Sequence, residues 1–298
     1  MSEVRGEIAL TFGCESAALI GVLHPGTAQA QTGVVIVVGG PQYRSGSHRQ
    51  FVLLARALAR HGVPVFRFDY RGMGDSDGPV VTFETVDRDI SAAIDTLFAQ
   101  VPSLTQVILW GLCDAASAGL FYAHQDKRVA GLVILNPWVR TEAGMARTYM
   151  KHYYLQRFLS REFWSKVVRG QFDIKASLRS LNDFINKMRG TSAAPVAGSN
   201  GSSVQVKASV PAALPDRMAS AWEKFSGPVL LILSVNNDYV ADEFRDVAQS
   251  SNRWRKLLQR SSTTRKDFPG ANHTFSRRDW RDQVAEWTRV WIATHFSH

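Results

Sequence analysis

Strands and helices alternate along the first half of this sequence, and that alternation is the feature that most limits what the chain can fold into. A continuous β-branched run, GVVIVVGG at 33–40, predicts a strand that is buried on both faces. Apolar residues at helical spacing follow at 49–62, and strand and helix patterns then succeed one another as far as residue 136. Such an order favours right-handed crossovers between parallel strands, with helices on both faces of the sheet. The sequence therefore predicts an α/β fold with a mostly parallel central sheet.

The alternation stops midway along the chain and resumes in its last quarter. The intervening part contains helical patterns rich in aromatic and basic residues, followed by a low-complexity Gly/Ser/Ala segment at 190–203 that is typical of a flexible loop. We therefore predict a core formed by 1–137 and 226–298, interrupted by a helical cap insertion at 138–225. The predicted strands are 6–12, 17–24, 33–40, 63–70, 106–111, 129–137 and 227–234, and the predicted helices outside the insertion are 49–62, 83–100, 114–125, 253–260 and 278–295.

Composition and charge narrow the class of protein. With 298 residues and 45% hydrophobic content, the chain has enough apolar material for a packed core. Two cysteines do not make a disulfide framework, the start MSEVRGEIAL does not resemble a secretory signal, and no run approaches roughly 18 apolar residues, so a cytoplasmic location is expected. The net charge of +9 is spread along the chain without a recognised nucleic-acid-binding module. No nucleic-acid partner is therefore expected, and the sequence predicts no oligomeric state.

One of the two cysteines lies in WGLCDAASAGL, at 110–120. Cys113 stands between a predicted strand and a predicted helix, with the small residues Gly111 and Ala115 on either side. This is the setting of a nucleophile elbow, where a sharp strand-to-helix turn holds the reactive residue in strained backbone geometry. The N-terminal amides of the following helix would favour a thiolate. The alternative interpretation is a buried structural thiol, because free cysteine is among the most buried residue types.

A catalytic cysteine needs a base, and the base needs an acid that orients it. His273 lies in FPGANHTF, a loop shortly before the last helix, and Asp238 follows the strand pattern VLLILS. The chain order of nucleophile, acid and histidine is that of an elbow-type hydrolase. We therefore predict a Cys113–His273–Asp238 triad, with Asp242 as the alternative acid, although Asp242 is expected to cap the following helix.

Two backbone N–H groups would be needed to stabilise an oxyanion. Asp114, the residue after the nucleophile, is the first candidate. The second should come from the loop after the buried strand, where Pro41 has no N–H and either Gln42 or Gly40 is therefore the donor.

Basic residues near these loops are candidates for substrate binding. Arg44 and His48, together with Arg140 and Lys151 of the insertion, could hold an anionic group of a substrate, or each could be an ordinary solvent-exposed charge. The glycine-rich loop at 39–46 has neither a P-loop lysine nor a dinucleotide-binding pattern. We predict neither a cofactor nor a metal ion.

Several strings in the sequence carry a family likeness. The segments 34–78, which contains GGPQYRSGSHRQF, 109–118, which reads LWGLCDAASA, and 132–164, which begins LVILNPWVRTEAG, closely resemble the exosortase A system-associated hydrolase 1 family. That family belongs to the α/β-hydrolase superfamily and occurs beside exopolysaccharide and protein-sorting genes in Gram-negative bacteria. The resemblance implies an α/β-hydrolase fold and an esterase or thioesterase activity with cysteine at the elbow.

Three functions are compatible with these features. The first is hydrolysis of a small-molecule ester or thioester through an acyl-enzyme on Cys113, with the cap shaping the acyl pocket. The second is an acyltransferase that passes the same acyl group to a sugar or amine. The third is a non-catalytic scaffold in which the basic, aromatic stretch 147–170 makes peripheral contact with a membrane or partner. The intact order of the triad favours an enzyme over the scaffold.

Overall fold

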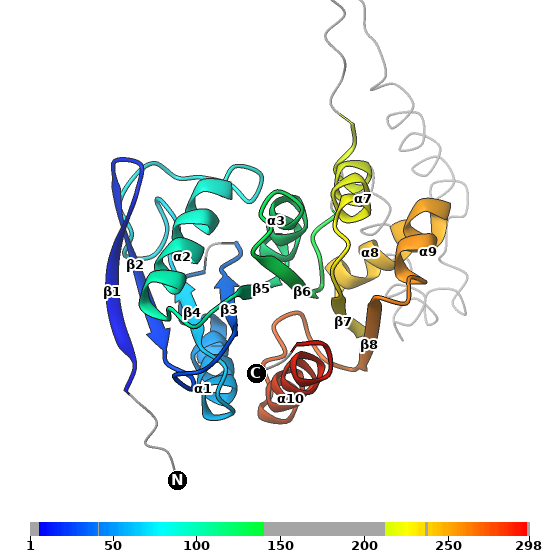
Figure 1. Ribbon diagram of the computed structural model, residues 1–298. Helices are drawn as coiled ribbons and strands as arrows, with labels where there is room; N and C mark the ends of the chain where they lie inside the picture. The colour runs from blue at the N-terminus through cyan, green and yellow to red at the C-terminus, as the bar shows by residue number, and fades with distance from the viewer. Residues whose placement is uncertain (1–5, 41, 140–211, 236–237, 297–298) are drawn as a thin grey trace, which may run out of the picture. The chain divides into compact units, whose positions relative to one another are not determined.

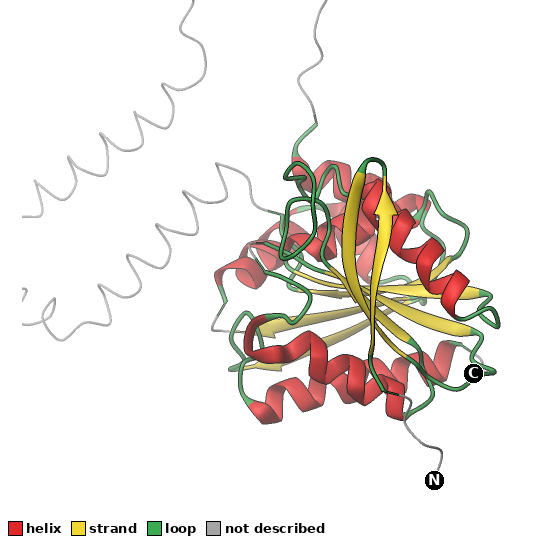
Figure 2. Ribbon diagram, turned by 90° about the vertical axis from the view of Figure 1, so that its left-hand side faces the viewer, coloured by secondary structure: helices red, strands yellow, loops and turns green. Residues whose placement is uncertain are grey.

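An eight-stranded sheet with helices on both faces forms the described part of the protein, as Figures 1 and 2 show from two sides. The chain divides into two units, and the first of them, Met1–Gly144 with Ala212–His298, contains every described residue. The computed structural model describes residues 6–40, 42–139, 212–235 and 238–296.

The strand order in the sheet is β1-β2-β4-β3-β5-β6-β7-β8. The first two strands form an antiparallel hairpin, and β2 pairs antiparallel with β4. From β4 onward every pair of neighbours is parallel, so the prediction of a mostly parallel sheet is confirmed. The strands are β1 Ile8–Cys14, β2 Ala17–His24, β3 Thr32–Val37, β4 Val65–Phe68, β5 Gln106–Leu112, β6 Val129–Leu135, β7 Val229–Val235 and β8 Thr263–Pro269.

Burial follows the position of each strand in the sheet. Every residue of β3 is buried, as the continuous apolar run at 33–40 predicts, and β5, β6 and β7 are almost as deeply covered. The two edge strands, β1 and β8, are largely exposed. β8 is not among the predicted strands, because its sequence TTRKDFP lacks both an apolar run and a clean alternation.

Helices cover both faces of the sheet. In Figure 1, α1 and α10 lie on one face, and α2, α3 and α7 lie on the other. The apolar face of α1 is spaced as a helix requires, with Phe51, Leu54 and Leu58 buried, and Gly62 follows its end at a φ of 87°. The described helices are η1 Ser47–Arg49, α1 Gln50–Arg60, α2 Asp87–Gln100, α3 Asp114–Ala123, α7 Leu214–Lys224, α8 Tyr239–Ser250, α9 Asn252–Leu258 and α10 Arg278–His295.

The predicted cap insertion, 138–225, falls mostly outside the described residues. These leave out 140–211, which includes the Gly/Ser-rich loop at 190–203, the basic and aromatic stretch at 147–170, and Arg140 and Lys151. Within the described remainder, α7 packs against α3 and α9, and its Trp222 makes an edge-to-face contact with Trp254. The boundaries of the cap therefore stay a prediction.

The turn from β5 to α3 has no space for a side chain at Gly111. A Cβ atom there would lie 2.6 Å from the carbonyl carbon and oxygen of Ala115 and 2.7 Å from the amide nitrogen of Ala116. These contacts are with backbone atoms of the first turn of α3, which cannot rotate away. Gly119, within α3, differs: a Cβ atom added there would make only ordinary van der Waals contacts, 3.7 Å from Leu132 and 4.0 Å from Leu109.

We expect Gly111→Ala to lower the free energy of unfolding by about 1–3 kcal/mol, because the overpacked methyl group must displace helix backbone. The matched change Gly119→Ala should leave stability unchanged or raise it by up to about 1 kcal/mol, since alanine favours the helix that glycine weakens. Urea denaturation of the two variants measures the difference. Equal stabilities would contradict the tight packing of this turn.

Candidate active site

Cys113 occupies the turn between β5 and α3. Its backbone has φ 64° and ψ −126°, a conformation that residues with a side chain adopt only where the surrounding structure enforces it. The last residue of β6 and the segment after β6 hold it on both sides: the Cys113 amide donates to the Leu135 carbonyl at 2.9 Å, and the Cys113 carbonyl accepts from the Trp138 amide at 3.2 Å. The Cys113 side chain is partly exposed, whereas Cys14 is buried. The structure thus has the strained strand-to-helix turn that the sequence predicts.

His273 and Asp238 meet at the same edge of the sheet. The ring nitrogen Nδ1 of His273 lies 2.8 Å from Oδ2 of Asp238. That same carboxylate oxygen accepts from the Ser234 hydroxyl at 2.7 Å, while Oδ1 accepts from the Val240 amide at 2.9 Å. Because three donors converge on Asp238 and the residue is 6% exposed, its position is closely fixed.

The prediction that Asp242 caps the helix after β7 is wrong. Asp238 itself is the N-cap residue of α8, through its bond from the Val240 amide. Asp242 lies in the first turn of α8, where its carboxylate pairs with Arg245. One carboxylate, that of Asp238, therefore both caps α8 and bonds the His273 ring.

The electrostatics of this cluster favour a charged histidine. Burial lowers the pKa of His273, but hydrogen bonds to Asp238 and Cys113 and the charges of both outweigh that effect and raise it to about 10. Burial likewise works to raise the pKa of Asp238, yet the bond to His273, its positive charge and the Ser234 hydroxyl hold that pKa below its usual value. At neutral pH, an imidazolium therefore lies between an aspartate and the Cys113 side chain.

The two candidate oxyanion donors from the loop after β3 differ in what they already bond. The Gly40 amide donates to Oδ2 of Asp114 at 2.9 Å, so that N–H is occupied. Burial raises the pKa of Asp114, and the bond from Gly40 opposes the rise. Gly39 lies so close to this carboxylate that an added Cβ would be 2.3 Å from its Oδ1. The side chain of Gln42 accepts from the Ser47 amide at 3.3 Å. The Gln42 amide is thus the remaining candidate from this loop, while Pro41 lies outside the described residues.

Arg44, predicted to bind substrate, is paired with two carboxylates, and its role in substrate binding stays a prediction. Its guanidinium pairs with Asp69 and, at 2.7 Å, with Asp75, and its amide also donates to Asp69. Its carbonyl in turn accepts from the buried Arg67 at 3.0 Å. Because two carboxylates already neutralise its charge, Arg44 fastens the loop after β3 to the loop after β4.

His48 is exposed and lies in η1 with left-handed backbone, φ 55°. No hydrogen bond among the described residues connects it to Cys113, His273 or Asp238. Its role in substrate binding therefore stays a prediction.

Two buried polar residues at the site escaped the sequence analysis. Ser234, the next-to-last residue of β7, bonds the catalytic-acid candidate Asp238, and Asn136, directly after β6, donates to the His273 carbonyl at 3.1 Å. Each is a polar residue at the carboxyl end of an apolar strand. A polar residue at that position could have been recognised in the sequence as a candidate site residue, because ligands and reacting groups gather at this edge of an α/β sheet.

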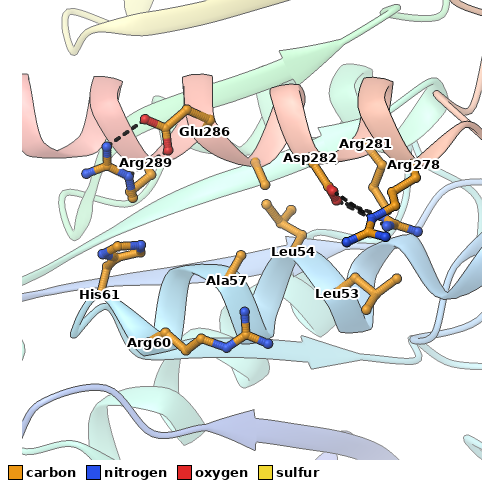
Figure 3. A pocket seen from close by; sticks show the side chains of 11 residues that line it. Leu53, Leu54, Ala57, Arg60, His61, Arg278, Arg281, Asp282, Glu286 and Arg289 are labelled. Atoms are coloured by element: carbon orange, nitrogen blue, oxygen red, sulfur yellow. Dashed lines mark hydrogen bonds and ion pairs between the residues drawn. The ribbon is translucent and has the colours of Figure 1, made fainter. Parts of the chain in front are cut away.

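A hollow of about 400 Å³ lies between α1 and α10 (Figure 3). Figure 3 shows Arg289 beside Glu286, and Arg278 and Arg281 beside Asp282, so much of the charge in this groove is paired within α10. None of the described residues that line it is a cysteine, serine or threonine that could act as a nucleophile. The residues lining it are Leu53, Leu54, Ala57, Arg60, His61, Arg278, Arg281, Asp282, Ala285, Glu286 and Arg289.

The described ranges contain neither a candidate metal site nor a candidate membrane span. Among residues 6–40, 42–139, 212–235 and 238–296, no group of three or more His, Cys, Asp or Glu side chains could hold a metal ion. No helix in this part of the chain combines the length and apolar character needed to cross a membrane.

Comparisons with known proteins agree with the fold described above. The model of the Alpha/beta hydrolase family matches residues 34–287. The chain is similar to the structure of an esterase from Pyrococcus furiosus, with 15% identity and a TM-score of 0.60 over 96% of this chain and 93% of that one. Est1E from Butyrivibrio proteoclasticus, with ferulic acid bound, gives 15% identity and 0.60 over 96% and 99%. A dienelactone hydrolase from Anabaena variabilis gives 14% identity and 0.59 over 98% and 99%. No curated protein sequence matches the chain.

We expect NMR titration to find the His273 ring with a pKa near 10 and to find a lower value, closer to 6.5, in Asp238→Asn. The sign follows from the contacts: the aspartate accepts a hydrogen bond from the protonated ring and attracts its charge, so its neutralisation favours the deprotonated ring. His24, whose pKa burial and Arg67 lower to about 4, should titrate identically in both proteins and serves as the control. An unchanged His273 titration would contradict the pairing with Asp238.

Proposed function

The chain belongs to the Alpha/beta hydrolase family, and on that premise we propose that it cleaves an ester or thioester bond through a covalent intermediate on Cys113. The observation that carries the proposal is the cluster of three side chains at one edge of the sheet: Cys113 lies at a strained elbow and helps to raise the pKa of His273, and the His273 ring bonds Asp238. This is the arrangement that nucleophilic catalysis requires: a nucleophile, a proton carrier and a group that orients the carrier.

In the first step, the Cys113 thiolate attacks the carbonyl carbon of the substrate. The new C–S bond forms as the π electrons move to the carbonyl oxygen. When the tetrahedral intermediate collapses, the bond to the leaving alcohol or thiol breaks, and the imidazolium of His273 gives its proton to that leaving group. A histidine with a pKa near 10 holds this proton at neutral pH, so the resting pair is ready to act without an external acid.

The negative charge on the carbonyl oxygen needs two donors. The amide of Asp114, at the start of α3, is the first, and the amide of Gln42 is the second. The Gly40–Asp114 hydrogen bond supports this assignment, because it fastens the loop that carries Gln42 to the residue next to Cys113.

Deacylation reverses the roles. His273, now neutral, removes a proton from water as the oxygen attacks the thioester carbonyl, and the C–S bond to Cys113 breaks. The products are a carboxylic acid and the Cys113 thiolate, once more beside an imidazolium. Asp238 remains ionised throughout and keeps Nδ1 of the ring protonated, so that Nε2 is the nitrogen that exchanges the proton.

We also propose that the chain is an exosortase A system-associated hydrolase 1, on the strength of the motifs at 34–78, 109–118 and 132–164. The substrate would then be an acyl ester or thioester of an exopolysaccharide or protein-sorting system. The esterase from Pyrococcus furiosus and the dienelactone hydrolase from Anabaena variabilis are relatives in fold that act on bonds of the same class, as their names state.

We expect Cys113→Ala to lower the turnover of p-nitrophenyl acetate and of an acyl-thioester at least about 10³-fold, since the covalent route is lost. Cys14→Ala is the matched control, because it removes the buried thiol and should leave turnover unchanged. Intact-mass spectrometry of the wild-type protein mixed with either substrate should find one acyl adduct, and peptide mapping should assign it to Cys113. Full turnover by Cys113→Ala, or an adduct on another residue, would contradict the assignment of the nucleophile.

A further inference from the structure

Asn136 follows β6 directly and is fully buried. Its φ is 42°, in the left-handed region, although Pro137 comes next. Among residues with a side chain, asparagine is one of the few that tolerate this region, because its short amide can bond locally. A buried polar residue in a costly backbone conformation calls for interactions that maintain it.

The side-chain amide of Asn136 forms hydrogen bonds with two different segments. Its Nδ2 donates to the His273 carbonyl at 3.1 Å, and its Oδ1 accepts from the Ser234 amide at 2.9 Å. These partners also fix which end of the amide is which, because a carbonyl can only accept and a backbone N–H can only donate. The side chain therefore ties the histidine loop to the strand that precedes the aspartate.

The histidine loop and the end of β7 are also connected through Asp238. The Ser234 hydroxyl donates to Asp238, and Asp238 accepts from the His273 ring. The four residues thus form a closed ring of hydrogen bonds, from the His273 carbonyl through Asn136, Ser234 and Asp238 back to the His273 imidazole. A closed ring fixes the backbone and the side chain of His273 at the same time, which the Asp238 bond alone does not do.

The backbone around Asn136 extends this ring to the elbow. Leu135 accepts from the Cys113 amide, and the Trp138 amide donates to the Cys113 carbonyl. The backbone N–H of Asn136 donates to the Ile232 carbonyl in β7 at 3.1 Å. The short segment 135–138 is therefore bonded to all three residues of the candidate triad. It bonds the backbone of Cys113 and of His273 directly, and it bonds Asp238 through Ser234.

We propose that Asn136 is a positioning residue that aligns the His273 imidazole with Cys113 by holding the His273 carbonyl and the Ser234 amide at a fixed separation. The proposal rests on the function proposed above, since alignment has value only if the two side chains react together. Misplacement of a reacting group by about 1 Å can lower a rate about 10²-fold, so the loss of this tie should be visible in chemistry rather than in binding.

Two substitutions at this position separate positioning from folding. Asn136→Gly accepts the positive φ more easily than asparagine and removes both side-chain bonds. Asn136→Asp keeps the shape and the acceptor for the Ser234 amide, but at neutral pH it places a carboxylate oxygen against the His273 carbonyl in place of a donor. Thr288→Val is the control: Thr288 is fully buried in α10, and its hydroxyl donates to the Val284 carbonyl at 2.8 Å.

The experiment measures two rates in each variant that retains a cooperative unfolding transition. The first is the rate of alkylation of Cys113 by iodoacetamide at neutral pH, measured by intact-mass spectrometry, which reports the reactivity of the Cys113 sulfur beside His273 without any substrate. The second is the turnover of p-nitrophenyl acetate, resolved into kcat and KM. We expect both Asn136 variants to lower the alkylation rate and kcat about 10- to 100-fold, with KM changed less than about threefold, and Thr288→Val to leave both rates unchanged.

The outcomes are distinguishable. Alkylation and kcat within about twofold of wild type in both Asn136 variants would overturn the positioning role, and so would an equal loss in Thr288→Val, which would point to general destabilisation. If Cys113→Ala proves fully active, the proposed function fails, yet the alkylation rates still decide whether Asn136 aligns His273 with Cys113.

Discussion

Four neighbouring parallel strands end at one edge of the sheet, and the arrangement of the candidate site depends on the hydrogen-bonded register between them. Because β5, β6, β7 and β8 are adjacent and in chain order, the residues that follow them are adjacent as well. Cys113 follows β5, Asn136 follows β6, Asp238 follows β7, and His273 lies in the loop after β8. The pairing of these strands brings residues separated by up to 160 positions in the chain to one edge of the sheet.

Opposing electrostatic effects act on this edge. Burial disfavours every charge in the cluster, and for His273 it is the largest single effect. The ring nevertheless stays protonated, because Asp238 and Cys113 both bond it and both stabilise its charge. Asp238 stays ionised for the reciprocal reason, with Ser234 and the first turn of α8 satisfying its other lone pairs. Each of the two buried charges, on His273 and on Asp238, is stable only because the other is present, since either charge alone would lack compensation.

The loop after β3 depends on a second set of charges. Asp114 holds the Gly40 amide, and Asp69 holds both the amide and the guanidinium of Arg44. Two aspartates and one arginine thereby connect the loop after β3 to the loop after β4 and to the start of α3. Without these carboxylate partners, the guanidinium of Arg44 would be free to bind an anion. In the folded protein its charge serves to fix the loop next to the elbow.

The sequence by itself determined the α/β class, the sequence positions of nearly all the strands, the tight turn at Cys113 and the loops that carry Asp238 and His273. These features leave local signatures: a buried parallel strand is a continuous apolar run, and a sharp elbow requires small residues at fixed spacing. The edge strand β8 left no such signature, because an exposed strand has no burial pattern to impose on its residues.

Tertiary structure decided which polar groups meet. That Gly40 bonds Asp114, that Arg44 pairs with Asp69, and that Asn136 bonds His273 all depend on distances between segments far apart in the chain. A hydrogen bond forms or fails over a few tenths of an ångström, and such distances are set by how the strands pair and the helices pack. Residue type and spacing along the chain carry no information at that precision, so the fold could be predicted while the partners of its buried polar groups could not.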